Sequence, residues 1–409
     1  MEIEHQCPQC GAPVVLDEAD RLLSCSFCRT KLYLSTPNHF RYQIPSVREK
    51  HSDMVYLPYW RLKGNSFTVF PNEIVRRFID KNILAAHVPL LPNSLGVRPQ
   101  AMKVKFLSSE MEGQFLNVDR QYSGLVDDVK SLSGAAVKGR PYFYKAFIGE
   151  TISLIYSPAY IENNVLYDAF TKKRLRSWQP EKMEQVLSNT KPPNWQLRFV
   201  STLCPRCGWD LQGDKDALVL ICRNCDSAWH CPQGKLEAVS FSVLPTPLSD
   251  ETIYLPFWRM KPTWEGITLA SYADLIRVAN LPKKVQDIFE SQPLYFWSPA
   301  FKVNPALFLR LARQMTIDQP NIETNLSFRG AAFSQVTLSM QEAVESMMIT
   351  MASLVKNKRR IYPDLVNIGV IADDIRLVYQ PFKIGHREFT HPSLPIAIDR
   401  QAMHFSVYL

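Results

Sequence analysis

Two sets of four cysteines constrain this chain more than any other feature of its sequence. In each set, two Cys-x-x-Cys pairs are separated by fourteen residues, and every cysteine of the second set lies 197 positions after its counterpart. Two cysteines spaced in this way can turn both sulfurs to one side of a tight turn, and two such turns complete a tetrahedron of thiolates around Zn²⁺. We therefore expect two Zn²⁺ ions, one held by Cys7, Cys10, Cys25 and Cys28 and one by Cys204, Cys207, Cys222 and Cys225.

The same spacing also allows other uses of these cysteines. The pairs could be redox-active or form disulfides, but four matched pairs in one chain favour metal ligands. Cysteines almost confined to such pairs fit a reducing compartment, which predicts a cytoplasmic protein. The ninth cysteine, Cys231, has no counterpart in the first set. It is either a buried thiol or a substitute ligand.

A second repeated stretch follows each cysteine set. Residues 55–64 read VYLPYWRLKG and residues 253–262 read IYLPFWRMKP, with six of ten positions identical. A weaker match pairs Pro99 and Lys103-Val104 with Pro299 and Lys302-Val303. Another pairs 154–158 with 377–381, at an offset of 223. The matches keep their order, which indicates a tandem duplication.

The expected fold class is α+β, with two tandem copies of a small β zinc ribbon, each followed by a mixed, sheet-rich body. A chain of 409 residues is too long for a single core. We place ribbon 1 at 1–36, body 1 at 37–188, a connector with ribbon 2 at 189–242, and body 2 at 243–409. Strands are expected at 151–156, 164–170 and 374–379, and a helical connector at 180–187.

Body 2 should contain an extra helix near 339–358. Ser339 and Glu342 form a capping box ahead of apolar residues spaced by three and four. The second copy is 24 residues longer than the first around this segment, so we expect the additional residues to map to the helix. Its methionine-rich face could be a partner groove, although the pattern favours a helix facing the core.

The repeated Tyr-Leu-Pro-aromatic-Trp-Arg stretch has two interpretations. Proline cannot donate to a strand ladder, so Pro58 and Pro256 predict an edge strand or a bulge. One interpretation is an aromatic and basic interaction patch. The other is a junction strand with its tryptophan buried and its arginine paired with a carboxylate, which the repetition favours. The candidate patch residues are Tyr59, Arg61, Lys63, Arg259 and Lys261.

The four-cysteine module resembles the zinc ribbon, a small β module with two metal-binding turns on hairpins. A ribbon followed by this proline- and tryptophan-containing strand resembles bacterial zinc-ribbon proteins. The resemblance rests on residues 7–28 and 55–61 and on their copies in the second half. It implies a zinc-stabilised β module, which occurs both in nucleic-acid machines and in protein-docking adaptors.

The sequence carries no motif for catalysis. It has no glycine-rich phosphate loop, no His-Glu-x-x-His and no nucleophile elbow. His386 and His391 with Glu388 are the nearest approach to an acid–base or metal site, and a surface loop explains them better. Four sulfurs at each zinc leave no open position for a substrate. We therefore expect a protein that is not an enzyme.

The distribution of charge helps to distinguish two possible functions, binding a protein partner and binding nucleic acid. Residues 1–200 hold 26 Lys and Arg against 19 Asp and Glu, a moderate basic excess that permits contact with nucleic acid. The ribbon hairpins are instead acidic, which disfavours contact with phosphate. We expect an adaptor for a protein partner, with nucleic-acid binding as the alternative. No run reaches the ~18 apolar residues of a membrane span. The hairpin acids are Asp17, Glu18 and Asp20 in ribbon 1 and Asp210, Asp214 and Asp216 in ribbon 2.

Overall fold

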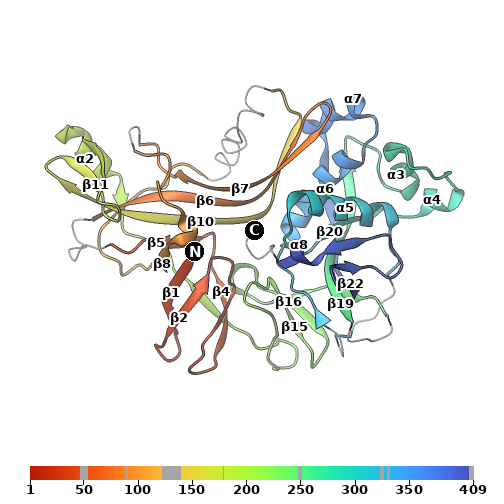
Figure 1. Ribbon diagram of the computed structural model, residues 1–409, viewed down its shortest axis with the longest axis horizontal. Helices are drawn as coiled ribbons and strands as arrows, with labels where there is room; N and C mark the ends of the chain where they lie inside the picture. Colours follow the sequence, from red (N-terminus) through yellow and green to blue (C-terminus); the bar gives the residue numbers. More distant parts are fainter. Residues whose placement is uncertain are drawn as a thin grey trace.

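A computed structural model describes residues 1–46, 54–88, 91–121, 140–177, 179–246, 251–322, 327–328 and 332–404. Strands predominate among these residues, and most of the helices gather in body 2 (Figure 1). The fold is therefore broadly α+β, as the sequence predicts.

The largest sheet has eleven strands and joins ribbon 1 to body 1, in the order β13-β9-β6-β10-β5-β8-β1-β2, with β7 on β6 and β11–β12 on β10. Because β1 pairs in parallel with β8, the sheet continues across the boundary expected at residue 36. Its strands are β1 (Glu2–Gln6), β2 (Pro13–Asp17), β5 (Phe40–Gln43), β6 (Met54–Val69), β7 (Ile74–Leu84), β8 (Lys103–Phe106), β9 (Gln114–Leu116), β10 (Tyr144–Glu162), β11 (Val165–Asp168), β12 (Arg174–Ser177) and β13 (Thr190–Lys191).

Body 2 is built on a sheet of seven strands, and each ribbon contributes to a sheet of three. The seven are β18 (Phe241–Val243), β19 (Thr252–Glu265), β20 (Phe296–Pro299), β21 (Ala332–Phe333), β22 (Gly369–Ile384), β23 (Glu388–Thr390) and β24 (Ala397–Asp399). The small sheets are β3 (Leu22–Ser24), β4 (Lys31–Ser35) and β14 (Arg198–Ser201), and β15 (Val219–Cys222), β16 (Ser227–His230) and β17 (Glu237–Val239).

The expected helices at 180–187 and near 339–358 are both present. Glu342 N donates to Ser339 Oγ and Ser339 N to the Glu342 carboxylate, which completes the predicted capping box. Met347 and Met351 are fully buried, so the methionine-rich helix faces the core. The helices are α2 (Pro180–Ser188), α3 (Tyr272–Ala279), α4 (Asp287–Ser291), α5 (Pro305–Asp318), α6 (Met340–Leu354), α7 (Lys358–Ile361) and α8 (Arg400–His404), with 3-10 turns at Pro99–Ala101, Pro232–Gly234 and Tyr362–Asn367.

The two bodies share one pattern of strand pairing. Trp60 of β6 lies opposite Leu154 of β10, and Trp258 of β19 lies opposite Leu377 of β22, both in antiparallel register. In addition, β10 pairs in parallel with β5, and β22 pairs in parallel with β18. The strands around the repeated stretch therefore occupy equivalent places in the two bodies.

Backbone hydrogen bonds extend this equivalence beyond the strands. Ala85 N donates to Pro58 O at 2.9 Å, and Ala300 N donates to Pro256 O at 3.0 Å. Each alanine carbonyl then accepts two backbone N–H groups, from residues 119 and 120 in body 1 and from 337 and 338 in body 2. The indole of Trp60 donates to the carbonyl of residue 120 (2.7 Å) and that of Trp258 to the carbonyl of residue 338 (2.9 Å).

The two prolines do not lie on edge strands, because β6 and β19 are paired on both sides. On the side away from β10 or β22, each proline instead lies between the segments that pair with two successive partner strands. On one side of β6, β9 pairs with Val55 and Tyr56, and the pairing with β7 begins only at Tyr59. The Pro58 carbonyl faces this interval, and in a strand the N and O of one residue face the same side. The missing N–H is therefore tolerated there.

These contacts also correct the alignment of the two halves. The offset is 198 for Trp60 and Trp258, 215 for Ala85 and Ala300, and 223 for Leu154 and Leu377. Most of the additional residues of body 2 therefore precede Ala300, where α3 and α4 lie, and not at α6. The match of Pro99 with Pro299 is wrong, because Pro299 pairs with Phe257 whereas Leu84 pairs with the equivalent Tyr59.

The halves are joined at two places. The long strands β6, β7 and β10 cross from body 1 to body 2 (Figure 1), where Phe67 packs on Phe308 of α5 and Asn65 donates to Val303 O. Below them the two ribbons lie side by side. The backbone N–H groups of Arg21 and Leu22 donate to Lys215 O.

Candidate metal centres and polar network

The first four cysteines converge on one point at the end of ribbon 1. The four sulfur atoms lie within 4.8 Å of one another, with Cys7 and Cys28 3.7 Å apart and Cys10 and Cys25 3.7 Å apart. Cys7 and Cys25 are buried, and Cys10 and Cys28 are exposed. The site is thus anchored in the protein on one side and open to solvent on the other.

Local backbone turns create this convergence. Gly11 N donates to Cys7 O, and Gly11 has φ of +74°, a conformation that glycine adopts without strain. The second turn lacks glycine and places Arg29 at φ +62° after Cys28, with Arg29 N donating to Cys25 O. A turn of the same shape is therefore built with a non-glycine residue, at a small conformational cost.

The second four cysteines repeat this arrangement. Cys204 and Cys225 are 3.7 Å apart and Cys207 and Cys222 are 3.5 Å apart, and all four sulfurs lie within 4.8 Å. Gly208 has the same φ of +74° as Gly11. The eight predicted ligands are therefore brought together in the two predicted sets, each of which could hold a metal ion.

The sulfur separations test whether a metal fits. A disulfide requires about 2.05 Å between sulfurs. A tetrahedron with metal–sulfur bonds of about 2.3 Å has edges of about 3.8 Å. The observed 3.5–3.7 Å matches the tetrahedron and excludes a disulfide geometry. Four sulfur donors also suit a soft or borderline metal rather than Ca²⁺ or Mg²⁺.

The thiols of the second site differ in acidity. A hydrogen bond from Asn224 lowers the pKa of Cys207 to about 6, whereas burial raises the pKa of Cys222 to about 12. Four neighbouring thiolates repel one another, so the set ionises fully only around a cation. Cys231 belongs to neither set; it is half-buried, and burial raises the pKa of its thiol to about 11.

The candidate interaction patch is not assembled on the surface. Tyr59 is 3% exposed and Arg61 is fully buried, so neither is accessible to a partner. Lys63 and Arg259 are half-buried, and only Lys261 is exposed. Arg259 lies over the ring of Tyr295, 3.2 Å from its centroid. The patch is therefore wrong for its buried members Tyr59 and Arg61, whose burial fits the junction-strand interpretation of the first copy.

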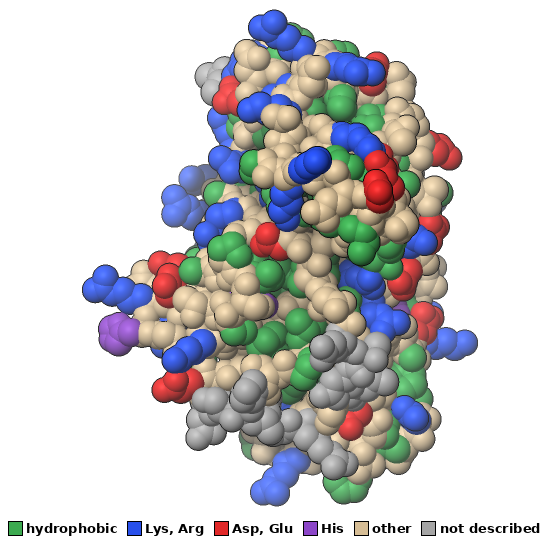
Figure 2. All heavy atoms as spheres, turned by 90° about the vertical axis from the view of Figure 1, so that its right-hand side faces the viewer, with side chains coloured by type: hydrophobic (Ala, Val, Ile, Leu, Met, Phe, Trp, Pro, Cys, Tyr) green, Lys and Arg blue, Asp and Glu red, His purple; other side chains and the backbone are tan. Residues whose placement is uncertain are grey.

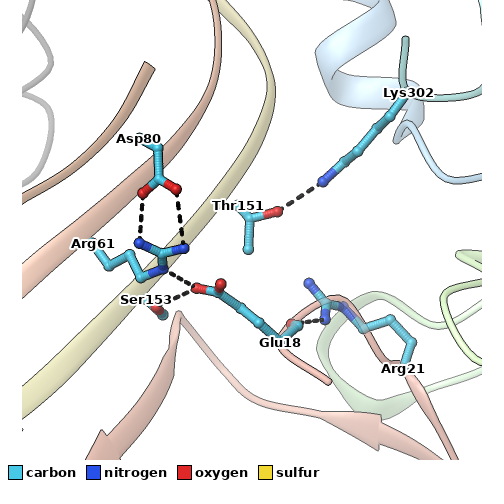
Figure 3. A network of polar contacts seen from close by, with 7 residues as sticks. All are labelled: Glu18, Arg21, Arg61, Asp80, Thr151, Ser153 and Lys302. Carbon is cyan, nitrogen blue, oxygen red and sulfur yellow. Dashed lines mark hydrogen bonds and ion pairs between the residues drawn. The ribbon is translucent and has the colours of Figure 1, made fainter. Parts of the chain in front are cut away.

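Arg61 forms the centre of a buried polar network (Figure 3). Its guanidinium donates to the Glu18 carboxylate at 2.6 Å and to the Asp80 carboxylate at 2.6 Å. Ser153 donates to the same oxygen of Glu18. These residues come from ribbon 1, β6, β7 and β10, so the network ties the ribbon to the body.

The prediction of an acidic hairpin tip on ribbon 1 is wrong for two of its three carboxylates. Glu18 is 6% exposed and Asp20 is 7% exposed, and Asp20 accepts a hydrogen bond from Asp17 N. Both carboxylates point into the protein, because Arg61 and the hairpin backbone supply their partners. Only Asp17 of the three is exposed, whereas in ribbon 2 Asp210 and Asp214 are exposed and Asp216 is half-buried.

His386, His391 and Glu388 do not form a site. His391 is buried between Gln380 and the backbone N–H groups of Ser393 and Leu394, and burial lowers its pKa to about 4. His386 and Glu388 are exposed. Lys302 appears in the sequence only as part of a weak repeat match, but in the structure it donates to Thr151 of body 1 at 2.7 Å (Figure 3). No local sequence pattern identifies it as a functional residue.

No protein family, curated protein or solved structure matches this chain. The helices among the described residues are all too short or too polar to cross a membrane.

Proposed function

We propose that this chain is a non-enzymatic adaptor that holds two structural Zn²⁺ ions and contacts a protein partner through its ribbons. The observation that carries the proposal is the pair of closed four-sulfur sets beside exposed aromatic side chains. Each set supplies all four positions of a tetrahedral ion, so its role is to stabilise the ribbon. Thiolate ligands must stay reduced, which fits the cytoplasm.

Zinc is the metal that fits best. Four thiolates in a tetrahedron are typical of structural zinc, with iron as the main competitor for such a site. Elemental analysis of protein purified without chelator should give two zinc ions per chain. Iron in their place, or well under two metal ions, would contradict this part of the proposal.

Each ribbon exposes a large aromatic side chain beside a metal-binding turn. Phe27, between Cys25 and Cys28, is 68% exposed, and Trp209, next to Gly208, is 59% exposed. Aromatic residues are enriched at the centres of protein interfaces, because they bury a large area with little loss of side-chain freedom. A rigid metal-centred turn presents such a side chain in a fixed position. These two residues are therefore the contacts that we assign to the partner.

Nucleic-acid binding is the second candidate. The inward position of Glu18 and Asp20 removes two carboxylates from the tip of ribbon 1, and exposed aromatic rings also stack on bases. Against it, Asp17 of ribbon 1 and Asp210 and Asp214 of ribbon 2 are exposed, and the face of body 2 in Figure 2 also mixes Lys and Arg with Asp and Glu. We therefore keep the protein partner as the main proposal.

Site-specific photo-crosslinking in cells tests the contact surface. A photoreactive phenylalanine at position 27 or 209 should give a discrete crosslinked protein band. The same group at Ile288 or Val366, which are 67% and 76% exposed in body 2, serves as the control. Equal bands from all four positions, or bands from the controls alone, would contradict the proposal.

Fluorescence anisotropy with single-stranded and duplex oligonucleotides separates the two candidates. An adaptor should bind them with a Kd in the micromolar range or weaker near physiological salt, as non-specific contacts do. Nanomolar binding that falls steeply with salt, and that weakens in Phe27→Ala or Trp209→Ala, would establish the nucleic-acid function instead. Arg61 is unsuitable for this test, because its replacement disturbs the core.

A further inference from the structure

A cavity of about 490 Å³ lies between the two ribbons and body 2. Ribbon 1 contributes Arg21, body 2 contributes Lys302 with the rings of Phe301 and Phe333, and α8 contributes Arg400. The volume is within the range of small-molecule sites, which are mostly apolar with a few polar groups. Such pockets form preferentially where separate units meet, as they do here.

Among the described residues, no ion pair joins a cation of this cavity to a carboxylate. Lys302 Nζ donates to the hydroxyl of Thr151 at 2.7 Å, and no carboxylate of the described residues lies within ion-pair distance of it. Arg21 donates to backbone carbonyls of its own hairpin, and Arg400 to Gly385 O. These cations are thus bonded to neutral oxygens, and the carboxylates of Asp216 and Glu342, which also line the cavity, act on Lys302 only at longer range.

The equivalent place in body 1 is different. His87 lies two residues after Ala85, as Lys302 lies two residues after Ala300. His87 N donates to the Asp119 carboxylate (2.7 Å), and Lys302 N donates to the Thr337 hydroxyl (2.9 Å). Asp119 also contacts the His87 ring, 3.0 Å from Nδ1. Body 1 therefore supplies an anion at this place, and body 2 supplies a neutral hydroxyl that lines the cavity.

We propose that the cavity binds a small organic anion, with its negative group on the Lys302 ammonium and its apolar body against Phe301 and Phe333. The ligand would supply the negative charge that Asp119 supplies in body 1, where body 2 has only the neutral Thr337 hydroxyl. Glu342 also lines the cavity, but its carboxylate is engaged at the start of α6. Asp214 and Asp216 line the cavity from ribbon 2, and Asp216 also interacts electrostatically with Lys302, so a bound anion would compete with it for the ammonium.

The charge on Lys302 depends on pH. Burial lowers its pKa to about 8, while Glu342 and Glu18 oppose this and Arg21 and Lys63 add to it. An unfolded lysine has a pKa near 10.4. The unfolded chain therefore binds more protons between about pH 8 and 10.4, and stability rises with pH in that window. Below pH 8 the protonated Lys302 destabilises the ligand-free protein, and a bound anion removes this penalty.

Isothermal titration calorimetry with three matched probes tests the site. The probes are 1-naphthoate, 1-naphthyl phosphate and the neutral 1-naphthylmethanol, each titrated into the zinc-loaded protein at pH 7. At least one anion should bind with one-to-one stoichiometry, and the alcohol should bind much more weakly. The two anions distinguish a carboxylate from a phosphate ligand. Binding of the alcohol as tight as that of the anions, or no binding by any probe, would overturn the proposal.

Variants locate the binding. Lys302→Met should weaken the anion about 10- to 100-fold, since a hydrogen bond to a charged group contributes about 1.5–3 kcal/mol. Lys302→Arg should retain most of the affinity, and Lys383→Met, at an exposed lysine paired with Glu251, should change nothing. Unchanged binding in Lys302→Met would overturn the assignment.

Thermal unfolding of the ligand-free variants gives a second readout. Lys302→Met should unfold at a higher temperature than the natural chain at pH 7, and the difference should shrink as pH rises from 8 to 10. A lysine that only supports the fold would instead lose stability when replaced, at every pH.

Discussion

Bodies 1 and 2 have the same hydrogen-bonded frame but fill it with different side chains. The pairings around Trp60 and Trp258 are alike, down to the backbone carbonyl that each indole reaches. The neighbouring arginines differ. Arg61 is fully buried with two carboxylates, whereas Arg259 is half-buried, lies over Tyr295 and has Asp374 only at 4.0 Å. Backbone pairing therefore keeps equivalent residues at equivalent positions, while the charged partners of those residues differ between the two bodies.

The surroundings of each arginine explain the divergence. Arg61 lies opposite Ser153, whose hydroxyl joins the Glu18 network, but Arg259 lies opposite Arg376. The offset of 197 also places Lys215 of ribbon 2 where ribbon 1 has Glu18. A cation at that place cannot neutralise Arg259. The buried link between ribbon and body is therefore a property of the first half.

Loss of a metal site should have the largest effect on either half. Cys10→Ser and Cys207→Ser should each remove one zinc and leave the other. Each should lower the Tm by about 10 °C or more, because zinc binding contributes on the order of 10 kcal/mol to the folding of such modules. Differential scanning calorimetry with elemental analysis measures both quantities. Cys231→Ser is the control and should keep two zinc ions, and loss of metal there would mean that Cys231 is a ligand.

The arginines provide the next test of the comparison. Arg61→Met should destabilise the chain by about 3–5 kcal/mol, because it leaves the buried Glu18 carboxylate unpaired. Arg259→Met should cost about 1 kcal/mol, the value of a partly exposed stacking cation. Urea unfolding monitored by circular dichroism gives both values. Glu18→Gln in the Arg61→Met background should restore part of the loss, and equal costs at the two arginines would break the contrast.

The tryptophans test the similarity instead of the difference. Trp60→Phe and Trp258→Phe should each cost about 1–2 kcal/mol, since each loses one hydrogen bond to a backbone carbonyl and part of its ring contacts. The two costs should agree within about 0.5 kcal/mol if the environments are equivalent. Measured under the same urea conditions, a difference of several-fold would show that the frames are not equivalent.

The sequence alone determined the features that depend on short-range spacing. The cysteine sets, the capping box at Ser339 and the helix at 180–187 each involve residues that are close in the chain, where backbone geometry limits the outcome. The repeated stretch likewise predicted a buried tryptophan, which the structure has at both copies.

The tertiary structure decided everything that depends on distant partners. Arg61 meets Glu18, 43 positions earlier, and Lys302 meets Thr151, 151 positions earlier, so neither contact leaves a periodic trace in the sequence. The alignment of the two halves from sequence alone is likewise wrong between Trp60 and Ala85, because it could not detect the strand pairings that make these positions equivalent to Trp258 and Ala300. A β7 hairpin in body 1 and the helices α3 and α4 in body 2 fill the same interval with chains of different length. Strand pairing fixes where such segments end, and their length and composition are free to change between those points.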